Sequence, residues 1–380
     1  MRRLCVGLAV TTVAATFAGV AGAHPVLIGS TPDENARLAK GPTAVSLRFS
    51  EPVEPVGDGI TVSGPDGAPT VVGTPLVRGS TLSRSIASTQ TGTYVVEWIV
   101  VGDDGHPARG AFLFSVGSPS QAALPGHQSS GVVLVGLGRW LSLLGYALGF
   151  GIIFAALLSG GTTKRLWRPV SAGIVLLLVA EPVLLLGELA TLAPSRVFDA
   201  GFARDVLLTR YGHLAGLRVA AAIGLWALAG AVRRSSTRTQ WSIPVAGIVV
   251  AFVYAAGSHR TYTIPASLSL TLGAAHVAAF AAWFGCIVVA LAESRGRRLA
   301  QPAALAALVL VSSGAGLALA HLRAISDLVE TAYGATLAVK LTLVAIALAL
   351  GALGRRRAEL AAALAVLAVA GVLVSLAPPV

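Results

Sequence analysis

Two hydrophobic patterns divide the chain near residue 130. Before this point, short stretches alternate apolar and polar positions, and the turn signals Asp58-Gly59 and Pro65-Asp66-Gly67 separate them. Alternation with a period of two is typical of strands that bury one face. The alternating apolar residues are Val45, Leu47 and Phe49, then Tyr94, Val96, Trp98 and Val100, with a further strand expected over 111–116. The pattern predicts an all-β domain over residues 24–117, an Ig-like β-sandwich, followed by a polar linker over 118–130.

After residue 130 the chain is a series of long apolar runs. Each approaches the roughly 20 residues that an α-helix needs to cross about 30 Å of hydrocarbon. The runs lie near 131–158, 170–193, 212–232, 241–258, 267–292, 302–321, 334–353 and 359–377. They predict an all-α polytopic domain of about eight transmembrane helices over residues 131–380. Composition agrees, because 55% of the 380 residues are hydrophobic and only 12% are charged, whereas soluble domains carry about 25% charged residues.

The first 23 residues have the three parts of a secretory signal peptide. A basic start at 2–3 and an apolar core over 4–17 precede the small-residue cleavage site Ala21-Gly22-Ala23. An uncleaved anchor helix is the alternative interpretation, but the apolar run is short. Cleavage after this site makes His24 the first residue of the mature chain. It also removes the only methionine and one of the two cysteines, so that Cys286 remains without a disulfide partner.

The basic residues predict how the chain is oriented in the membrane. The net charge is +11, but the Lys and Arg residues lie in short clusters rather than in one patch, which argues against a nucleic-acid partner. If the β-domain is outside the cell membrane, the four inner loops hold three basic residues each, and the outer loops hold five in all. The inner residues are Lys164, Arg165, Arg168, Arg233, Arg234, Arg238, Arg295, Arg297, Arg298, Arg355, Arg356 and Arg357. The positive-inside rule therefore predicts that the β-domain and the C-terminus are extracytoplasmic.

Two short segments of the β-domain carry groups that could bind a metal. A terminal amine and an imidazole on His24 could chelate one ion together, and such nitrogen ligands suit Cu(II). Asp104 and His106 flank a glycine just before the last predicted strand. They could present a carboxylate and an imidazole to one ion, although Asp-Gly is also a common turn pair. His127, in the linker, is expected to be solvated.

Four sequence blocks in the β-domain resemble the CopC copper-binding family. They are His24-Pro25-Val26-Leu27 with Ser30-Thr31-Pro32, Leu47-Arg48-Phe49-Ser50-Glu51-Pro52-Val53, Asp104-Gly105-His106-Pro107, and Gly110-Ala111-Phe112-Leu113-Phe114-Ser115-Val116. The resemblance implies a cupredoxin-like β-sandwich in which His24, Asp104 and His106 bind Cu(II). The methionine-rich Cu(I) site of the family has no counterpart, because the mature chain has no methionine for a thioether ligand.

The helical half is similar to CopD, the membrane partner of CopC, fused here to it in one chain. The matching segments are Gly257-Ser258-His259, Ala275-His276, Trp283-Phe284-Gly285, Thr331-Ala332-Tyr333-Gly334 and Lys340-Leu341. The resemblance implies a role in copper uptake or copper tolerance. A fused CopC–CopD protein would hold its metal site and its membrane route in a single polypeptide.

Ionisable residues inside the apolar runs need a reason, because a charge at mid-bilayer costs roughly 2.5–3.5 kcal/mol on the insertion scale. Glu181 and Glu188 are seven residues apart in the second run and share a helix face. Lys340 lies in the seventh run. The two glutamates could therefore form a structural pair with Lys340, or they could form a carboxylate track for copper. His276 lies about nine residues into the fifth run, roughly 14 Å deep.

The predicted topology puts His213, His259 and His321 at outer span ends, on the side of the β-domain. With His276 they form a possible copper path, and a short outer loop would bring His259 and His276 together. Cys286 is either a small buried hydrophobic residue or a thiolate ligand.

The leading hypothesis is a copper-binding transport protein that is not an enzyme: the β-domain captures Cu(II), and the helices pass copper inward. The sequence contains no phosphate-binding G-x-x-x-x-G-K-[ST] motif, which argues against a primary pump driven by nucleotide hydrolysis. A copper- or haem-dependent membrane oxidoreductase is one alternative, since intramembrane histidine pairs ligate haem. A copper-delivery factor for an oxidase, which would bind copper without moving it, is another. The sequence does not distinguish copper import from copper export, and it indicates no protein partner.

Overall fold

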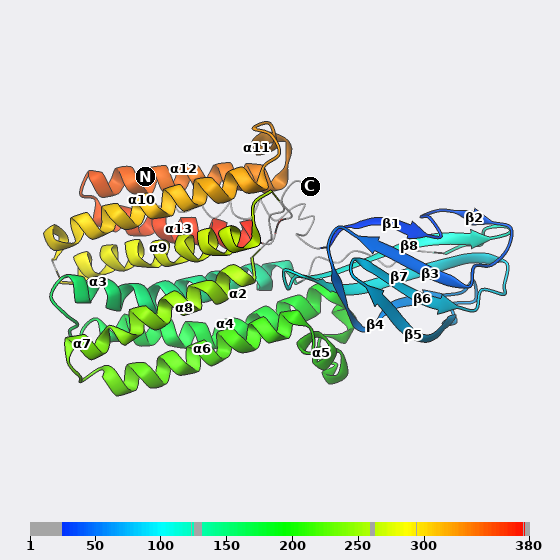
Figure 1. Cartoon of the computed structure of the whole chain (residues 1–380), viewed down its shortest axis with the longest axis horizontal. Helices are drawn as coiled ribbons and strands as arrows, with labels where there is room; N and C mark the ends of the chain where they lie inside the picture. Colours follow the sequence, from blue (N-terminus) through cyan, green and yellow to red (C-terminus); the bar gives the residue numbers. More distant parts are fainter. Residues whose placement is uncertain are drawn as a thin grey trace. The chain divides into compact units, whose positions relative to one another are not determined.

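A computed structural model describes residues 25–122, 124, 131–258, 263–293, 295–374 and 376. Contacts divide the chain into two compact units. The β-unit comprises His24–Gly131 together with Glu188–Leu214, and the helical unit comprises Val132–Gly187 and Ala215–Val380. Figure 1 shows strands in the first and long helices in the second. The segment 188–214 includes the end of the second predicted apolar run and the start of the third, yet it is part of the β-unit.

The β-unit is a sandwich of two four-stranded sheets. One sheet has the order β1 (Leu27–Thr31), β3 (Ala44–Phe49), β6 (Thr81–Ile86) and β5 (Val71–Arg78). The other has the order β2 (Arg37–Leu38), β8 (Pro107–Val116), β7 (Gly92–Gly102) and β4 (Val53–Ser63). Pairing is antiparallel except between β2 and β8. The predicted β-sandwich is therefore confirmed.

The alternating residues form the sandwich core. Val45, Leu47 and Phe49 of one sheet are buried in one cluster with Val96 and Trp98 of the other. The rings of Phe49 and Trp98 meet edge to face across the sheets, with centroids 5.0 Å apart. Edge-to-face contact is a favoured geometry for aromatic pairs. The period-two pattern thus fixes which face of each strand points inward.

Seven helical segments of the described chain are long and apolar enough to span a bilayer, judged by length and composition. They are Val132–Leu158 (α2, the π-helical turn η1 and α3), Trp167–Leu192 (α4), Arg210–Val232 (α6), Thr237–Ala256 (α7 and α8), Ala266–Glu293 (α9), Gly296–His321 (α10) and Ala332–Ala352 (α12). Each overlaps one of the predicted apolar runs. The chain is a multi-pass membrane protein.

The last predicted run corresponds to α13 (Arg356–Leu373). Its first turn carries Arg356, Arg357 and Glu359, so this 18-residue helix holds three charged side chains. It packs against α12 and α2. The eighth predicted run is therefore a helix, but it is not among the seven segments of the described chain that are long and apolar enough to span a bilayer.

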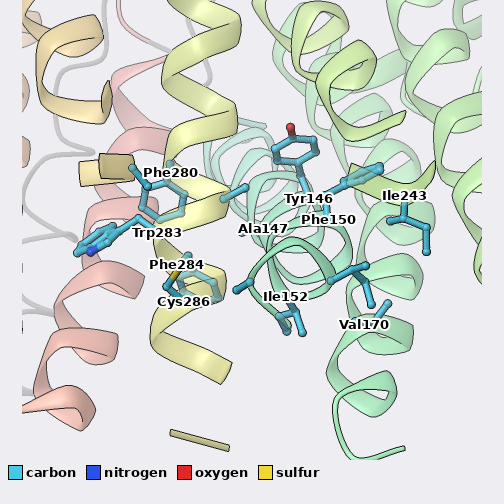
Figure 2. Close-up of a cluster of buried hydrophobic side chains, with 14 of the residues drawn as sticks. Tyr146, Ala147, Phe150, Ile152, Val170, Ile243, Phe280, Trp283, Phe284 and Cys286 are labelled. Carbon is cyan, nitrogen blue, oxygen red and sulfur yellow. The ribbon is translucent and has the colours of Figure 1, made fainter. Parts of the chain in front are cut away.

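Close helix packing in the helical unit depends on glycines. A Cβ on Gly151, at the end of η1 (Ala147–Gly151), would collide with the backbone of Ala281 in α9. A Cβ on Gly285 would likewise collide with the backbone of Gly151. Small residues let membrane helices approach in this way. Around this contact, Tyr146 and Phe150 of the first span belong to one buried cluster with Phe280, Trp283 and Phe284 of α9, which Figure 2 shows in close-up.

The segment 188–214 has local structure of its own. It contains the 3-10 turn η2 (Pro194–Arg196) and α5 (Ala200–Leu207). The Asp199 side chain caps α5 by accepting hydrogen bonds from the backbone N–H groups of Gly201 (2.9 Å) and Phe202 (3.1 Å). The backbone of Phe202, followed by the Arg196 side chain, holds the pKa of Asp199 below its usual value. The sequence predicted only a loop here, because the capping signal was not recognised.

Candidate metal centre

The turn between β7 and β8 presents the two candidate ligands of the β-unit. Gly105 has φ +82°, a conformation in which a side chain is strained, and its N–H donates to the Gly102 carbonyl oxygen at 2.9 Å. The Gly102 N–H in turn donates to the His106 carbonyl oxygen at 2.9 Å. Asp104 and His106 are each only 5% exposed. Backbone geometry therefore holds both side chains in a buried position at one end of the sandwich.

Asp104 and His106 contact one another directly. One carboxylate oxygen, Oδ1, accepts the backbone N–H of His106 at 2.9 Å, and the other, Oδ2, lies 3.0 Å from His106 Nδ1. Metal-binding histidines commonly have one ring nitrogen against a carboxylate, which orients the ring and raises its basicity. In this arrangement Nε2 is the ring nitrogen that would face a metal ion. The pair is thus arranged as one imidazole ligand with an orienting carboxylate, or as two ligands if the carboxylate also binds.

A second buried carboxylate, on Glu51, lies beside this pair. Glu51 is 9% exposed, and a Cβ built on Gly102 would collide with its Oε1 and lie 3.1 Å from Asp104 Oδ1. Sequence reasoning included Glu51 in a family-like block but gave it no role. Its signal was an acidic residue between the strands β3 and β4, immediately before Pro52. Glu51 is therefore an additional candidate for tuning or completing a metal site.

His24, the third predicted ligand, lies outside the described residues. Two residues later, the Val26 N–H donates to Ser50 Oγ at 3.0 Å, and the Val26 carbonyl accepts from the Ser50 N–H at 2.8 Å. Ser50 directly precedes Glu51 in the chain. Among the described residues, no group of three or more His, Cys, Asp or Glu side chains is placed to hold a metal ion. A complete site in this domain would therefore need ligands beyond the described Asp104 and His106.

Comparison with known proteins identifies both parts of the chain. The CopC domain model matches residues 27–117, and the model for Copper resistance protein D matches residues 293–359. Protein YobA of Escherichia coli (strain K12) is 33% identical over 120 residues, which are 30% of this chain and 95% of that protein. The chain belongs to the CopC family and is a CopC–CopD fusion. The Asp104–His106 turn and Glu51 lie within its CopC domain.

Two further relatives are similar to this fusion over different lengths. Copper resistance protein C of Xanthomonas campestris pv. juglandis is 33% identical over 117 residues, covering 28% of this chain and 91% of that protein. Copper transport protein CutJ of Bacillus subtilis (strain 168) is 26% identical over 414 residues, covering 94% of this chain and 75% of that protein. The likeness to CutJ thus extends through both the CopC domain and the membrane helices.

In the helical unit, His276 of α9 is enclosed by polar groups of two other helices, α10 and α12. Its Nδ1 lies 3.0 Å from the Leu310 carbonyl oxygen of α10, and its Nε2 lies 3.4 Å from Lys340 Nζ of α12. Ser313 Oγ is also 3.3 Å from Nδ1. Both ring nitrogens therefore have a polar neighbour in this structure. The predicted neighbour His259 lies outside the described residues.

Glu181 pairs with an arginine. Arg218 of α6 contacts it at two points, with Nε 2.6 Å from Oε1 and Nη2 3.0 Å from Oε2. The idea that Glu181 balances Lys340 is wrong for this structure, because Lys340 instead contacts His276. Sequence reasoning missed Arg218, although it is a charged residue inside an apolar run. A two-point arginine–carboxylate contact of this kind is among the stronger ion pairs.

The remaining candidates are dispersed. His321 ends α10 and lies near the Tyr333 ring, with centroids 5.9 Å apart, whereas His213 is exposed near the start of α6. Glu188 is buried near the end of α4 and belongs to the β-unit. Cys286 is buried within the hydrophobic cluster of α9, next to Phe284 in Figure 2.

Proposed function

We propose that this CopC–CopD fusion captures Cu(II) outside the cell membrane and passes copper inward through its helices. The observation that carries the proposal is the buried Asp104–His106 pair in a CopC domain that continues into a CopD-like membrane region. His24 would add an imidazole and the terminal amine. Nitrogen and carboxylate ligands without a thioether favour Cu(II) over Cu(I).

The extracytoplasmic position of the CopC domain is part of the proposal. It is supported by the basic residues, twelve on the predicted inner loops against five on the outer loops. It is also supported by the signal-peptide pattern at the N-terminus. Labelling of an engineered cysteine at exposed Glu34 by a membrane-impermeant maleimide in intact cells tests it. If labelling requires cell lysis, the CopC domain lies on the cytoplasmic side and the proposed orientation is wrong.

The mature chain is expected to begin at His24, because the Ala21-Gly22-Ala23 segment fits a signal-peptidase site. Only then is an amine available beside the imidazole of the same residue. The intact mass of the membrane-extracted protein measures the cleavage point directly. A chain that begins at any other residue would remove the amine ligand and require a different copper site.

Transport itself is tested by the copper content of cells with and without the gene, at fixed external copper. Inward passage predicts more cellular copper when the gene is present. Unchanged copper content, with Cu(II) still bound outside, would reject transport and favour a copper-delivery role. Lower copper content with the gene present would reverse the proposed direction.

His276→Ala is expected to reduce copper accumulation while leaving extracytoplasmic Cu(II) binding unchanged. The reason is its position: His276 lies ten residues after the start of α9 at Ala266, about 15 Å along the helix. An imidazole at this depth is a costly group that needs a polar partner or a function. His127→Ala in the linker is the matched control and should accumulate copper normally. Normal accumulation in an inserted His276→Ala protein would leave His276 with its structural contacts to Leu310 and Lys340 alone.

A further inference from the structure

The segment 188–214 contacts the CopC domain directly beside the candidate metal turn. Arg210, the first residue of α6, has Nη1 3.8 Å from Oδ1 of Asp103, the neighbour of Asp104 in the chain. The backbone N–H of Arg210 donates to Glu54 Oε2 at 2.8 Å. The first N–H groups of a helix have no partner within the helix and carry partial positive charge, so a carboxylate stabilises them. Glu54 therefore caps α6 from the β-sandwich.

The turn itself packs on the same face of α6. A Cβ built on Gly105 would lie 2.7 Å from Leu214 Cδ1 and 3.9 Å from Arg210 Cγ. Arg210 and Leu214 are four residues apart, so they are neighbours along one helix face. Gly105, between the two candidate metal ligands, thus lies against the Leu214 side chain of α6. Its positive φ of +82° favours glycine at position 105.

Two further contacts widen the interface away from the turn. Arg109 of β8 donates from Nη1 to the Leu192 carbonyl oxygen at the end of α4, at 3.1 Å. A Cβ on Gly57 of β4 would lie 2.9 Å from Asp205 Oδ2 of α5. Contacts therefore run from the end of α4 through α5 to the start of α6. The segment that makes them includes the end of α4 and the start of α6, two of the helices that are long and apolar enough to span a membrane.

We propose that the segment 188–214 is a docking platform that positions the copper turn of the CopC domain, with Arg210 as its positioning residue. The exposed His213, between Arg210 and Leu214 in α6, is then the first residue of the membrane region to accept copper from His106. This inference rests on the proposed function, because it specifies where the captured copper leaves the domain. It differs from a route that begins at His259 and His276, because it starts at His213 in the first turn of α6.

The docking contact is tested by cross-linking in membranes that contain the full-length protein. Asp103→Cys with Arg210→Cys should be joined by a short bis-maleimide, since the native side chains meet at 3.8 Å. Glu34→Cys with Arg210→Cys is the control, because the neighbouring Asn35 bonds to Leu113, toward the opposite end of β8 from the turn. The described native Cys286 is buried and should not react. Equal cross-linking of both pairs, or none in the first, would overturn the docking contact whether or not the protein transports copper.

Charge exchange tests the positioning role. Arg210→Glu places like charge against Asp103 and should lower copper accumulation on the order of tenfold, because juxtaposed like charges strongly disfavour an interface. Arg210→Lys should retain most accumulation, and Asp103→Arg combined with Arg210→Glu should restore much of the loss. Extracytoplasmic Cu(II) affinity should stay unchanged in Arg210→Glu. Loss that neither Lys nor the exchanged pair rescues would reject positioning by charge.

His213→Ala separates the acceptor role from docking. It should lower accumulation while the Asp103–Arg210 cross-link and the Cu(II) affinity remain as in the wild type. Normal accumulation in this variant would remove His213 from the route and leave the platform with its docking role alone. If the wild-type gene itself has no effect on cellular copper, the proposed function fails, and the cross-link still decides whether the platform exists.

Discussion

His106→Ala in the intact protein is expected to abolish tight Cu(II) binding. His106 is 5% exposed, and Asp104 Oδ2 lies 3.0 Å from its Nδ1, so the carboxylate fixes the orientation of the ring. Loss of an outer-shell partner typically costs about 10- to 100-fold in metal affinity, and loss of the ligand itself should cost more. Asp104→Ala should lie between wild type and His106→Ala, because the carboxylate orients the ring even where it does not bind. Cu(II) titration against a competing chelator measures the three affinities.

Control substitutions show whether a loss of Cu(II) affinity comes from the proposed ligands. His127→Ala removes a histidine from the linker, and Asp66→Ala removes an exposed carboxylate that bonds Gln90 at 2.9 Å; neither should alter the affinity. One extra residue before His24 should be about as damaging as His24→Ala, since it displaces the terminal amine. Unchanged titrations in His106→Ala and in the extended chain would mean that copper binds elsewhere. Glu51→Gln shows whether the second buried carboxylate contributes.

The sequence predicted those strands whose side chains strictly alternate between the core and solvent. Val45, Leu47 and Phe49 became the buried face of β3, and the 94–100 alternation became β7. β5 gave no such signal, because it is an edge strand with mostly exposed side chains and Pro75 in its interior. Helix positions followed from run length alone, because hydrocarbon thickness leaves little freedom.

Pairing between helices was not predictable in the same way. An apolar run does not show which face of the helix meets which neighbour, so the sequence left open whether Glu181 and Glu188 balance Lys340 or form a carboxylate track. Arg218 was overlooked. The docking platform was missed for a related reason. Glu54, Asp103 and Arg210 are each ordinary surface residues in sequence, and only the fold brings them together across more than a hundred positions. The candidate copper ligands were easier to identify, because Asp104 and His106 share one turn.

Arg218→Ala is expected to destabilise the helical unit strongly. Arg218 holds both carboxylate oxygens of Glu181, whose side chain is only 5% exposed, and its removal leaves a buried charge without this partner. Breaking a buried ion pair from one side typically costs about 3–5 kcal/mol. The expected result is a large drop in the thermal unfolding temperature of the detergent-solubilised protein. Arg357→Ala, at an exposed position of α13, is the matched control and should have little effect.

Replacing both Glu181 and Arg218 separates their role in stability from any role in copper transport. Glu181→Leu combined with Arg218→Leu should recover most of the stability, since an apolar pair of similar volume often substitutes for a buried ion pair without loss. No recovery would mean that the arginine stabilises the protein through contacts other than Glu181.

A stable double variant then tests the carboxylate track. If copper passes along Glu181, the ion pair must open during transport, and the double variant will insert and bind Cu(II) yet accumulate little copper. Normal accumulation would assign Glu181 and Arg218 to helix packing and direct the route toward His276.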